Sequence, residues 1–136
     1  MEIAEAFELQ EGRTSKRVHR DGVGYDLLSI SIQEERFIEV KGISESWKTY
    51  NWQPLFRSEV EALNKYPEKF FLYIIHFEET ANLSNYKLFV IHGTRLLNDG
   101  FRITPESFSL RPISQRRLAP YAVSVEKLVG KCAVGT

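Results

Sequence analysis

The sequence predicts an α/β fold in which a central mixed β-sheet is flanked by helices. Residues 70–77 form a near-continuous apolar run, which is typical of a central strand buried on both faces. A helical pattern at 58–66 precedes this run, and a helix between neighbouring strands implies a crossover connection. With 136 residues, 43% of them hydrophobic, the chain is expected to form one domain with a single core.

The first 24 residues predict a helix, a strand and a turn. Acidic residues in the first turn of 2–9 suit the dipole of a short helix. Its inward side is expected to carry three apolar residues, Ile3, Ala6 and Phe7. Residues 14–20 predict a strand, and the two glycines of 21–24 predict a flexible turn.

Two strands are predicted next, and they carry the charged residues of most interest. In 26–32, the side chains of Leu28, Ile30 and Ile32 alternate with serines, and Asp26 is in phase with the aliphatic set. In Phe-Ile-Glu-Val-Lys-Gly, residues 37–42, Glu39 and Lys41 point to one face, and Ile38 and Val40 point to the other. This pattern is typical of a strand that is covered on both faces.

The remaining elements follow from local signals. Residues 46–52 are rich in aromatic and β-branched residues and predict a third strand, whose aromatic rings suit the core, an interface or base stacking. Ser58 is the expected N-cap of the helix that Pro67 stops, and 78–85 is an expected polar turn before a strand at 86–91. From Asn98 the periodicity is lost, so the expected core spans about 14–92 and 98–136 is an irregular C-terminal extension.

The register between the two charged strands decides whether Asp26 meets Glu39. If 33–36 formed the tightest turn, Asp26 would lie opposite Ile43, roughly 13 Å along the strand from the partner of Glu39. If the loop is 32–35, Asp26 lies opposite Lys41 and diagonal to Glu39, roughly 7–8 Å away. Both registers place the charged residues on one face, but only the second forms a site.

Two carboxylates and one ammonium in a largely apolar sheet are costly without further positive charge, and a divalent cation is the usual remedy. The chemistry indicated is metal-dependent hydrolysis of a phosphodiester. The structural alternative is that Asp26 caps a turn and that Glu39 and Lys41 form an exposed ion pair on an edge strand. Isolated Glu-x-Lys patterns match by chance, so the order of the surrounding elements carries the functional interpretation.

Asp26 followed by Glu39-Val40-Lys41 resembles the PD-(D/E)xK nuclease superfamily, which has a restriction-endonuclease-like fold. The ordered set of 23–27, 36–42, 58–62 and 71–75 is more specifically similar to the domain at the C-terminus of protein NO VEIN. Tyr25 stands where the superfamily usually has proline. The resemblance implies catalytic roles for Asp26, Glu39 and Lys41.

The implied cofactor is Mg²⁺ or Mn²⁺, held by Asp26, Glu39 and the backbone carbonyl of Val40, with waters completing the shell. Lys41 is expected to orient or help deprotonate a bound water, or to screen the phosphate. The family pattern places Glu59 near the site, although compensation of the helix dipole explains this residue equally well. His19 is a further candidate substrate contact.

Composition limits the expected partners. The formal net charge is zero, so any contact with DNA or RNA must come from local patches. The compact basic cluster of the C-terminal region, Arg111, Arg116 and Arg117, is a candidate phosphate contact or a solvated surface. No apolar run approaches the roughly 20 residues of a membrane span, so an intracellular, cytoplasmic protein is expected.

Two functions are therefore expected from the sequence. The first is a metal-dependent nuclease that acts on nucleic acid, with DNA the favoured substrate and a homodimer as a possible assembly. The alternative is a non-catalytic module that keeps the nuclease-like core for nucleic-acid binding or protein assembly. Affinity for Mn²⁺ that depends on Asp26, Glu39 and Lys41 would distinguish the first function from the second.

Overall fold

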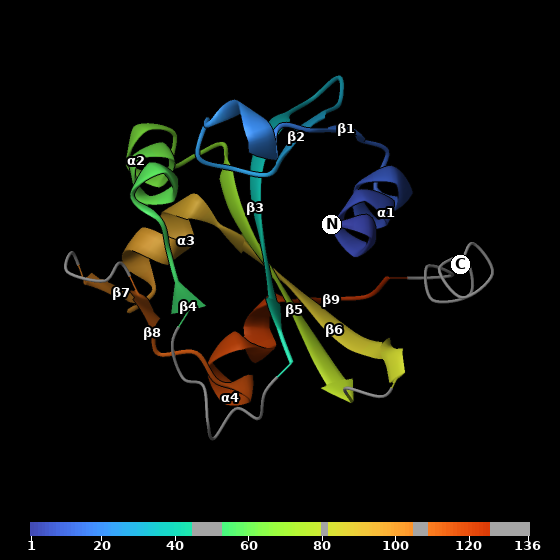
Figure 1. Ribbon diagram of the computed structural model, residues 1–136, viewed down its shortest axis with the longest axis vertical. Helices are drawn as coiled ribbons and strands as arrows, with labels where there is room; N and C mark the ends of the chain where they lie inside the picture. The colour runs from blue at the N-terminus through green and yellow to red at the C-terminus, as the bar shows by residue number, and fades with distance from the viewer. Residues whose placement is uncertain (45–52, 80–81, 105–108, 126–136) are drawn as a thin grey trace.

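The computed structural model describes residues 1–44, 53–79, 82–104 and 109–125. Within these residues, the larger sheet has the strand order β1 (Thr14–Arg17), β2 (Leu27–Ile30), β3 (Glu35–Ile43), β5 (Phe70–Glu79), β6 (Asn82–His92) and β9 (Ala122–Val123). A smaller sheet has the order β4 (Gln53–Pro54), β8 (Ser109–Arg111) and β7 (Arg102–Thr104). The helices are α1 (Glu2–Gln10), α2 (Arg57–Lys65), α3 (Gly93–Asn98) and α4 (Gln115–Leu118), with 3₁₀ turns η1 (His19–Asp21) and η2 (Ala119–Tyr121) (Figure 1).

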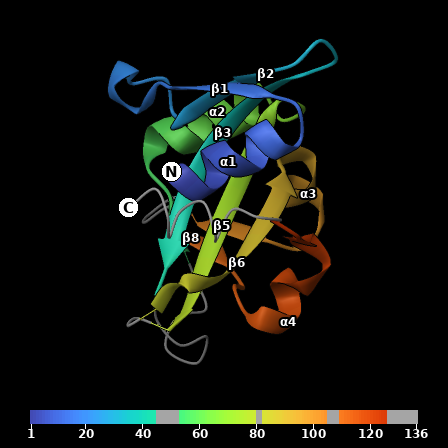
Figure 2. The same ribbon diagram turned by 90° about the vertical axis from the view of Figure 1, so that its right-hand side faces the viewer.

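The larger sheet is mixed, as predicted. Strands β3 and β5 are parallel and the connection between them contains α2, while the other neighbouring strands of this sheet are antiparallel. Figure 2 shows α1 in front of the sheet and α2 behind it. Every residue from Phe70 to His76 is buried, which confirms the predicted central strand. None of the helices in the described residues is long and apolar enough to cross a membrane.

The sheet separates two groups of buried side chains, because alternate residues of a strand point to opposite faces. On the α1 face, Phe7 packs with Ile38 and Tyr73. On the α2 face, Leu63 packs with Leu72 and Phe89. Glu39 pairs in register with Leu72, so its side chain points to the α2 face.

The connection between β2 and β3 differs from both predicted registers. Ile30 pairs with Glu35, and Leu27 pairs with Ile38, so continuing this register places Asp26 opposite Glu39. The turn closes early because the Ser31 N–H donates to the Glu34 carbonyl at 2.8 Å and the Ser31 hydroxyl accepts hydrogen bonds from the following backbone. The observed register differs from the nearer predicted one by two residues. Because this number is even, Asp26 still lies on the same face as Glu39 and Lys41, as predicted.

The alternating aliphatic residues predicted to be buried, Leu28, Ile30 and Ile32, are not the buried residues of this segment. Leu27 and Ser29 are fully buried, whereas Ile30 is about half exposed and Ile32 is fully exposed. The alternating pattern predicted the wrong face to be buried, because Leu27, which precedes the alternating residues, is the residue that packs in the core of the α1 face.

The first helix also buries a different set from the one predicted. Phe7 is buried as expected, but Ala4 and Glu8 are buried as well, while Ile3 and Ala6 are only partly covered. The strand expected at 14–20 is shorter than predicted. It ends at Arg17, and the turn η1 begins at His19. Burial of Glu8 is possible because Arg13 neutralises it, as described below.

Helix α2 begins one residue before the predicted cap. Its N-cap is Phe56 and not Ser58, because the Glu59 carboxylate accepts a hydrogen bond from the Phe56 N–H at 2.9 Å. The hairpin joining β5 and β6 is tighter than the predicted turn at 78–85, since the strands extend to Glu79 and from Asn82. The strand predicted at 46–52 lies outside the described residues.

The region after Asn98 was predicted to be irregular, and this is wrong for its described part. It contributes β7, β8, α4, η2 and β9. Leu110, Ile113 and Leu118 are fully buried in the core of the α2 face. Short elements without a repeating apolar pattern therefore complete the core.

Candidate functional site

Asp26 links the start of β2, which it immediately precedes, to the middle of β3. Its backbone N–H donates to the Ile38 carbonyl at 2.8 Å. One step further along β3, its carboxylate oxygen Oδ2 accepts a hydrogen bond from the Val40 N–H at 2.9 Å. The side chain of Asp26 therefore continues the hydrogen bonding of the strand pair ahead of Leu27, the first residue of β2, and this hydrogen bond fixes the carboxylate beside β3.

Lys41 links two carboxylates on the α2 face. Its Nζ lies 3.1 Å from Oε2 of Glu39 and 2.9 Å from Oε1 of Glu59. The side chains of Glu39 and Glu59 are only 5% and 8% exposed, so little water reaches either ion pair. Ion pairs at this depth are more strongly coupled than surface pairs, because the surroundings screen them less.

The electrostatics of this group leave Glu39 short of positive charge. Burial, together with the charges of Glu59 and Asp26, raises the pKa of Glu39 to about 9, and Lys41 opposes this increase. Burial favours the neutral amine of Lys41, but the charges and hydrogen bonds of Glu39 and Glu59 outweigh it and raise the Lys41 pKa. Lys41 is therefore a cation at neutral pH, and its one ammonium is shared by the carboxyl groups of Glu39 and Glu59.

The carbonyl of Val40 faces the same side as Asp26. The Phe37 N–H donates toward the β5 side, to the Lys69 carbonyl, whereas the Ile38 carbonyl accepts from Asp26. Because the backbone groups of successive strand residues point alternately to the two sides, the N–H and C=O of Val40 both point toward Asp26. Two carboxylates and one carbonyl oxygen thus approach one region of the sheet.

Gly24 brings the loop before Asp26 into contact with α2. This residue has a φ of 89°, and a Cβ atom built on it would lie 2.2 Å from the Ser58 carbonyl oxygen. Phe56, at the start of α2, has its ring 5.2 Å from Nζ of Lys41. These contacts hold the N-terminal end of α2, which carries Glu59, over the charged residues of β3.

This donor set fits a hard divalent cation. Mg²⁺ is commonly held by one or two carboxylates and keeps several waters, and a nearby carbonyl oxygen is an acceptable further ligand. Among the described residues, no group of three or more His, Cys, Asp and Glu side chains is arranged to hold a metal ion. The candidate centre therefore rests on two carboxylates and one backbone carbonyl, and not on a closed ring of protein ligands.

The other candidate residues lie elsewhere. His19 is exposed in η1, and no contact within the described part of the chain joins it to Lys41 or its partners. Arg111 lies opposite Arg102 in the smaller sheet, and Arg116 is exposed on α4. Arg117 stacks over the Phe101 ring at 4.9 Å, so the three predicted arginines do not form one patch beside Asp26 in the described residues.

Sequence reasoning missed a buried polar network on the opposite face. Arg13 donates two hydrogen bonds to the Glu8 carboxylate, at 2.7 and 3.0 Å. The Tyr73 hydroxyl donates to Glu8 and accepts from Arg36 at 2.9 Å. The available signal was the position of Glu8, four residues after Ala4 and next to Phe7 on the inner side of α1.

The comparisons with known proteins agree with this architecture. A family described as "Protein NO VEIN, C-terminal" matches residues 1–91. The structure is similar to that of Hjc, a Holliday junction resolvase from the archaeon Archaeoglobus fulgidus, with a TM-score of 0.53 and 20% sequence identity over 96% of each chain. This likeness shows a restriction-endonuclease-like fold. No curated protein has a significantly similar sequence.

Proposed function

This chain belongs to the protein NO VEIN C-terminal domain family, and we propose that it is a metal-dependent nuclease that hydrolyses nucleic-acid phosphodiesters, with DNA as the favoured substrate. The family match covers 91 of the 136 residues. The nuclease-like fold limits the classes of function, but a fold alone does not define an activity. The proposal therefore depends on the charged group around Lys41.

The observation that carries the proposal is the excess of carboxylate around one ammonium on a buried strand. Glu39 keeps a raised pKa although Lys41 lies 3.1 Å away. A further cation near Asp26 and Glu39 would offset this unfavourable burial. An ion pair with only a structural role would instead be expected to contain equal numbers of positive and negative charges.

Asp26, Glu39 and the Val40 carbonyl would hold Mg²⁺ or Mn²⁺. When bound, such an ion lowers the pKa of a coordinated water and offsets the negative charge that develops on the phosphate. The Val40 N–H orients the Asp26 carboxylate at 2.9 Å. Glu59 is a positioning residue, because its carboxylate lies 2.9 Å from the Lys41 ammonium.

Lys41 would act through its charge. Since its pKa is raised, it remains protonated at neutral pH and is poorly suited to removing a proton from water. Its ammonium would instead contact the scissile phosphate and orient the attacking water. Of the roles that the sequence suggested for Lys41, this proposal keeps orienting the water and screening the phosphate and drops deprotonation of the water.

The test combines metal binding with cleavage. We expect Mn²⁺ or Mg²⁺ to support cutting of labelled linear or four-way DNA, and Asp26→Asn and Glu39→Gln to reduce the rate at least about a hundredfold, because replacing even the outer partners of metal ligands costs about 10–100-fold. Calorimetric titration with Mn²⁺ should show a matching loss of affinity. Glu35→Gln is the matched control, since this carboxylate lies on the same strand but pairs with the exposed Lys69.

Two such centres would cut both strands of a duplex in one encounter, so a homodimer is part of the proposal and sedimentation of the protein on DNA tests it. Equal Mn²⁺ affinity in the wild type and in Glu39→Gln, with no cleavage by either, would refute the nuclease and favour the non-catalytic module. Binding of DNA without metal or cleavage would support that module directly.

A further inference from the structure

A hollow lies between the strands β5 and β6, the helix α3 and the turn η2. It has a volume of about 500 Å³, within the range of sites for small ligands. Phe71, Val90 and His92 form its side on β5 and β6, and Arg95 and Asp99 belong to α3 and its C-cap. The remaining lining residues come from the C-terminal region and are Arg117, Pro120 and Tyr121. We call this hollow the α3–η2 pocket.

The α3–η2 pocket is separate from the candidate metal centre. Phe71 pairs in register with His92, and Val90 pairs with Tyr73. Phe71 and Tyr73 point to the α1 face, whereas Glu39 points to the α2 face. The pocket therefore opens from the face of the sheet that the metal centre does not use, and its function does not depend on the proposed nuclease.

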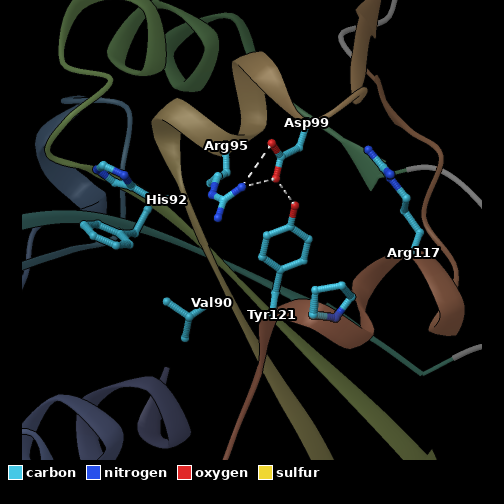
Figure 3. A pocket seen from close by; sticks show the side chains of 8 residues that line it. Val90, His92, Arg95, Asp99, Arg117 and Tyr121 are labelled. Carbon is cyan, nitrogen blue, oxygen red and sulfur yellow. Dashed lines mark hydrogen bonds and ion pairs between the residues drawn. The ribbon is translucent and has the colours of Figure 1, made fainter.

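Aromatic rings stand on two sides of the pocket. The rings of Phe71 and His92 are in contact, with centroids 4.7 Å apart. Figure 3 shows His92 on one side and Tyr121 on the other, with Arg95 reaching from α3 between them. Flat apolar walls of this kind favour a planar aromatic ligand, because stacking removes both ring faces from water.

The walls are held by hydrogen bonds, so the pocket is preformed. Nε2 of His92 lies 2.6 Å from the Glu68 carbonyl oxygen, and Nδ1 lies 2.9 Å from the Thr94 hydroxyl. The Tyr121 hydroxyl donates to Oδ2 of Asp99 at 2.5 Å. With these polar atoms engaged, His92 and Tyr121 present ring surface to a ligand.

Arg95 supplies a guanidinium cation that has hydrogen-bond donors available for a ligand. Its Nη1 donates to both carboxylate oxygens of Asp99, at 3.1 and 3.4 Å, and within the described residues its Nε and Nη2 form no hydrogen bond. The Arg95 side chain is 64% exposed, so its free edge is accessible to an anion. A guanidinium fork matches the geometry of a phosphate or carboxylate.

The remaining charges favour an anion over a neutral ligand. Arg117 lines the pocket as a second cation, while Asp99 is the one carboxylate among the described lining residues. The hydrogen bond from Tyr121 and the charges of Arg95 and Arg117 lower the pKa of Asp99, so it is ionised and already paired. The net charge of Arg95, Arg117 and Asp99 together is therefore +1.

From an aromatic slot, an accessible guanidinium and this volume, we propose that the α3–η2 pocket binds a nucleotide unit. The base stacks between Tyr121 and the Phe71–His92 pair, and the phosphate lies on the free edge of Arg95. A small aromatic acid would fill only part of the volume. The nucleotide unit is either a free mononucleotide or the 5′-phosphorylated end of a DNA strand.

The experiment measures binding by calorimetry in EDTA, which keeps divalent cations away from the metal centre. The probes are AMP, adenosine, inorganic phosphate, and short single-stranded DNA with or without a 5′-phosphate. We expect AMP to bind the full-length protein more tightly than adenosine or phosphate, because it uses both parts of the pocket. AMP that binds as well as the phosphorylated DNA identifies a free nucleotide as the ligand, and preference for the phosphorylated DNA identifies a strand end.

Two variants test the assigned contacts. Arg95→Gln should weaken AMP binding at least about tenfold, as expected for loss of a charge-assisted hydrogen bond. Tyr121→Leu should weaken it about five- to a hundredfold through lost stacking, while Tyr121→Phe, which keeps the ring, should lose less. Arg95→Gln should leave the thermal midpoint unchanged, because the side chain is mainly exposed.

The matched control is Arg102→Gln, an exposed arginine of β7 that does not line the pocket. It should leave AMP affinity unchanged. Equal weakening by Arg102→Gln and Arg95→Gln would show general charge attraction and overturn the proposal. Absence of binding by AMP and by both DNA probes at millimolar concentration would overturn it as well.

Discussion

Gly24 is the residue whose backbone places Asp26 beside α2. Its φ of 89° lies in the left-handed region, where side chains other than glycine are strained. A Cβ atom would also lie 3.0 Å from Cβ of Ala62, in addition to its overlap with the Ser58 backbone. Neither neighbour is the end of a flexible side chain, so the helix itself would have to move.

Replacing Gly24 should therefore destabilise the protein and displace the candidate site. We expect Gly24→Ala to lower the free energy of unfolding by at least about 1 kcal/mol more than Gly22→Ala, as measured by urea denaturation, because overpacking adds to the backbone strain. Gly22 is the matched control, since its φ is 68° and nothing lies within 4 Å of its added Cβ. Equal losses in the two variants would show that the contact with α2 is unimportant.

Tyr73 gives the protein a defined response to high pH. Burial, and next the nearby Glu8 carboxylate, raises the Tyr73 pKa. Because the folded state holds this proton more tightly than the unfolded state, the associated stability is complete below the ordinary tyrosine pKa of about 10 and is lost as pH rises above it. The direction is therefore alkaline destabilisation.

The corresponding prediction compares the wild type with Tyr73→Phe. The variant should be less stable at neutral pH by about 1–3 kcal/mol, because Glu8 and Arg36 each lose a buried hydrogen-bond partner. Its stability should also decline less steeply between about pH 9 and pH 11. Urea midpoints across this interval measure both effects, and parallel curves for the two proteins would contradict the assignment.

At the residue scale, the sequence predicted which side chains share a face but not which ones are buried. Alternation along β3 is a local property, so the common direction of Glu39 and Lys41 followed directly. Burial of Glu8 depends on Arg13 and Tyr73, which arrive from other elements. The link from Glu59 to Lys41 likewise exists only once α2 lies over β3.

Helix α1 carries two glutamates, Glu5 and Glu8, that each pair with an arginine beyond the helix, and the two pairs differ mainly in how deeply they are buried. Glu8 accepts from Arg13 at 2.7 and 3.0 Å, and Glu5 accepts from Arg17 at 2.6 and 3.0 Å. The side chains of the first pair are 0% and 8% exposed, whereas those of the second are 28% and 46% exposed. The helix thus contains its own control for the effect of burial on an ion pair.

We expect Glu8→Gln to cost about 2–3 kcal/mol, because it removes the buried counter-charge of the Arg13 guanidinium and leaves only Glu34, which is 38% exposed and lies 3.2 Å away. Glu5→Gln should cost less than about 1 kcal/mol, since the exposed pair is screened by water. Urea denaturation of the two variants at neutral pH measures the difference. Similar costs would mean that Arg13 recovers solvent in the variant and that the network does not hold α1 against the sheet.

At the element scale, the β2–β3 hairpin shows the limit of pattern reasoning. The pattern required an even shift of register, and the observed shift is even, but its size was set by the turn. Hydrogen bonds to the Ser31 hydroxyl close the loop one residue earlier than in the nearer of the predicted registers, and this moves the partner of Asp26 by two residues, from Lys41 to Glu39. The result places Asp26 opposite Glu39, a closer approach than the diagonal one expected from the sequence.

At the scale of the molecule, the mixed sheet could be predicted because its central strands are long and apolar. The C-terminal part could not, because β7, β8 and α4 each span only three or four residues. Such segments contain no complete apolar repeat, and their burial is determined by the core that they cover. The apolar side chains that these short elements add to the core nevertheless decide how much of the chain is needed for folding.

The family match ends at residue 91, yet the core of the α2 face continues beyond it. Five buried residues of that core lie after the match, namely Leu96, Phe101, Leu110, Ile113 and Leu118. Burial of each large apolar side chain contributes about 1.5–3 kcal/mol, so their combined loss is comparable to the total stability of a typical domain, about 5–15 kcal/mol. We therefore propose that 1–136 forms one folding unit.

Truncation tests this unit. A chain ending at His92 should lack a cooperative unfolding transition by near-UV circular dichroism, because β5 and β6 would expose the surface that the C-terminal elements cover. A chain ending at Val125 retains all five of those core residues and should unfold cooperatively. Cooperative folding of the shorter chain would instead make 1–92 an autonomous core, and the later elements would then be an added layer with no part in holding α2 over Glu39.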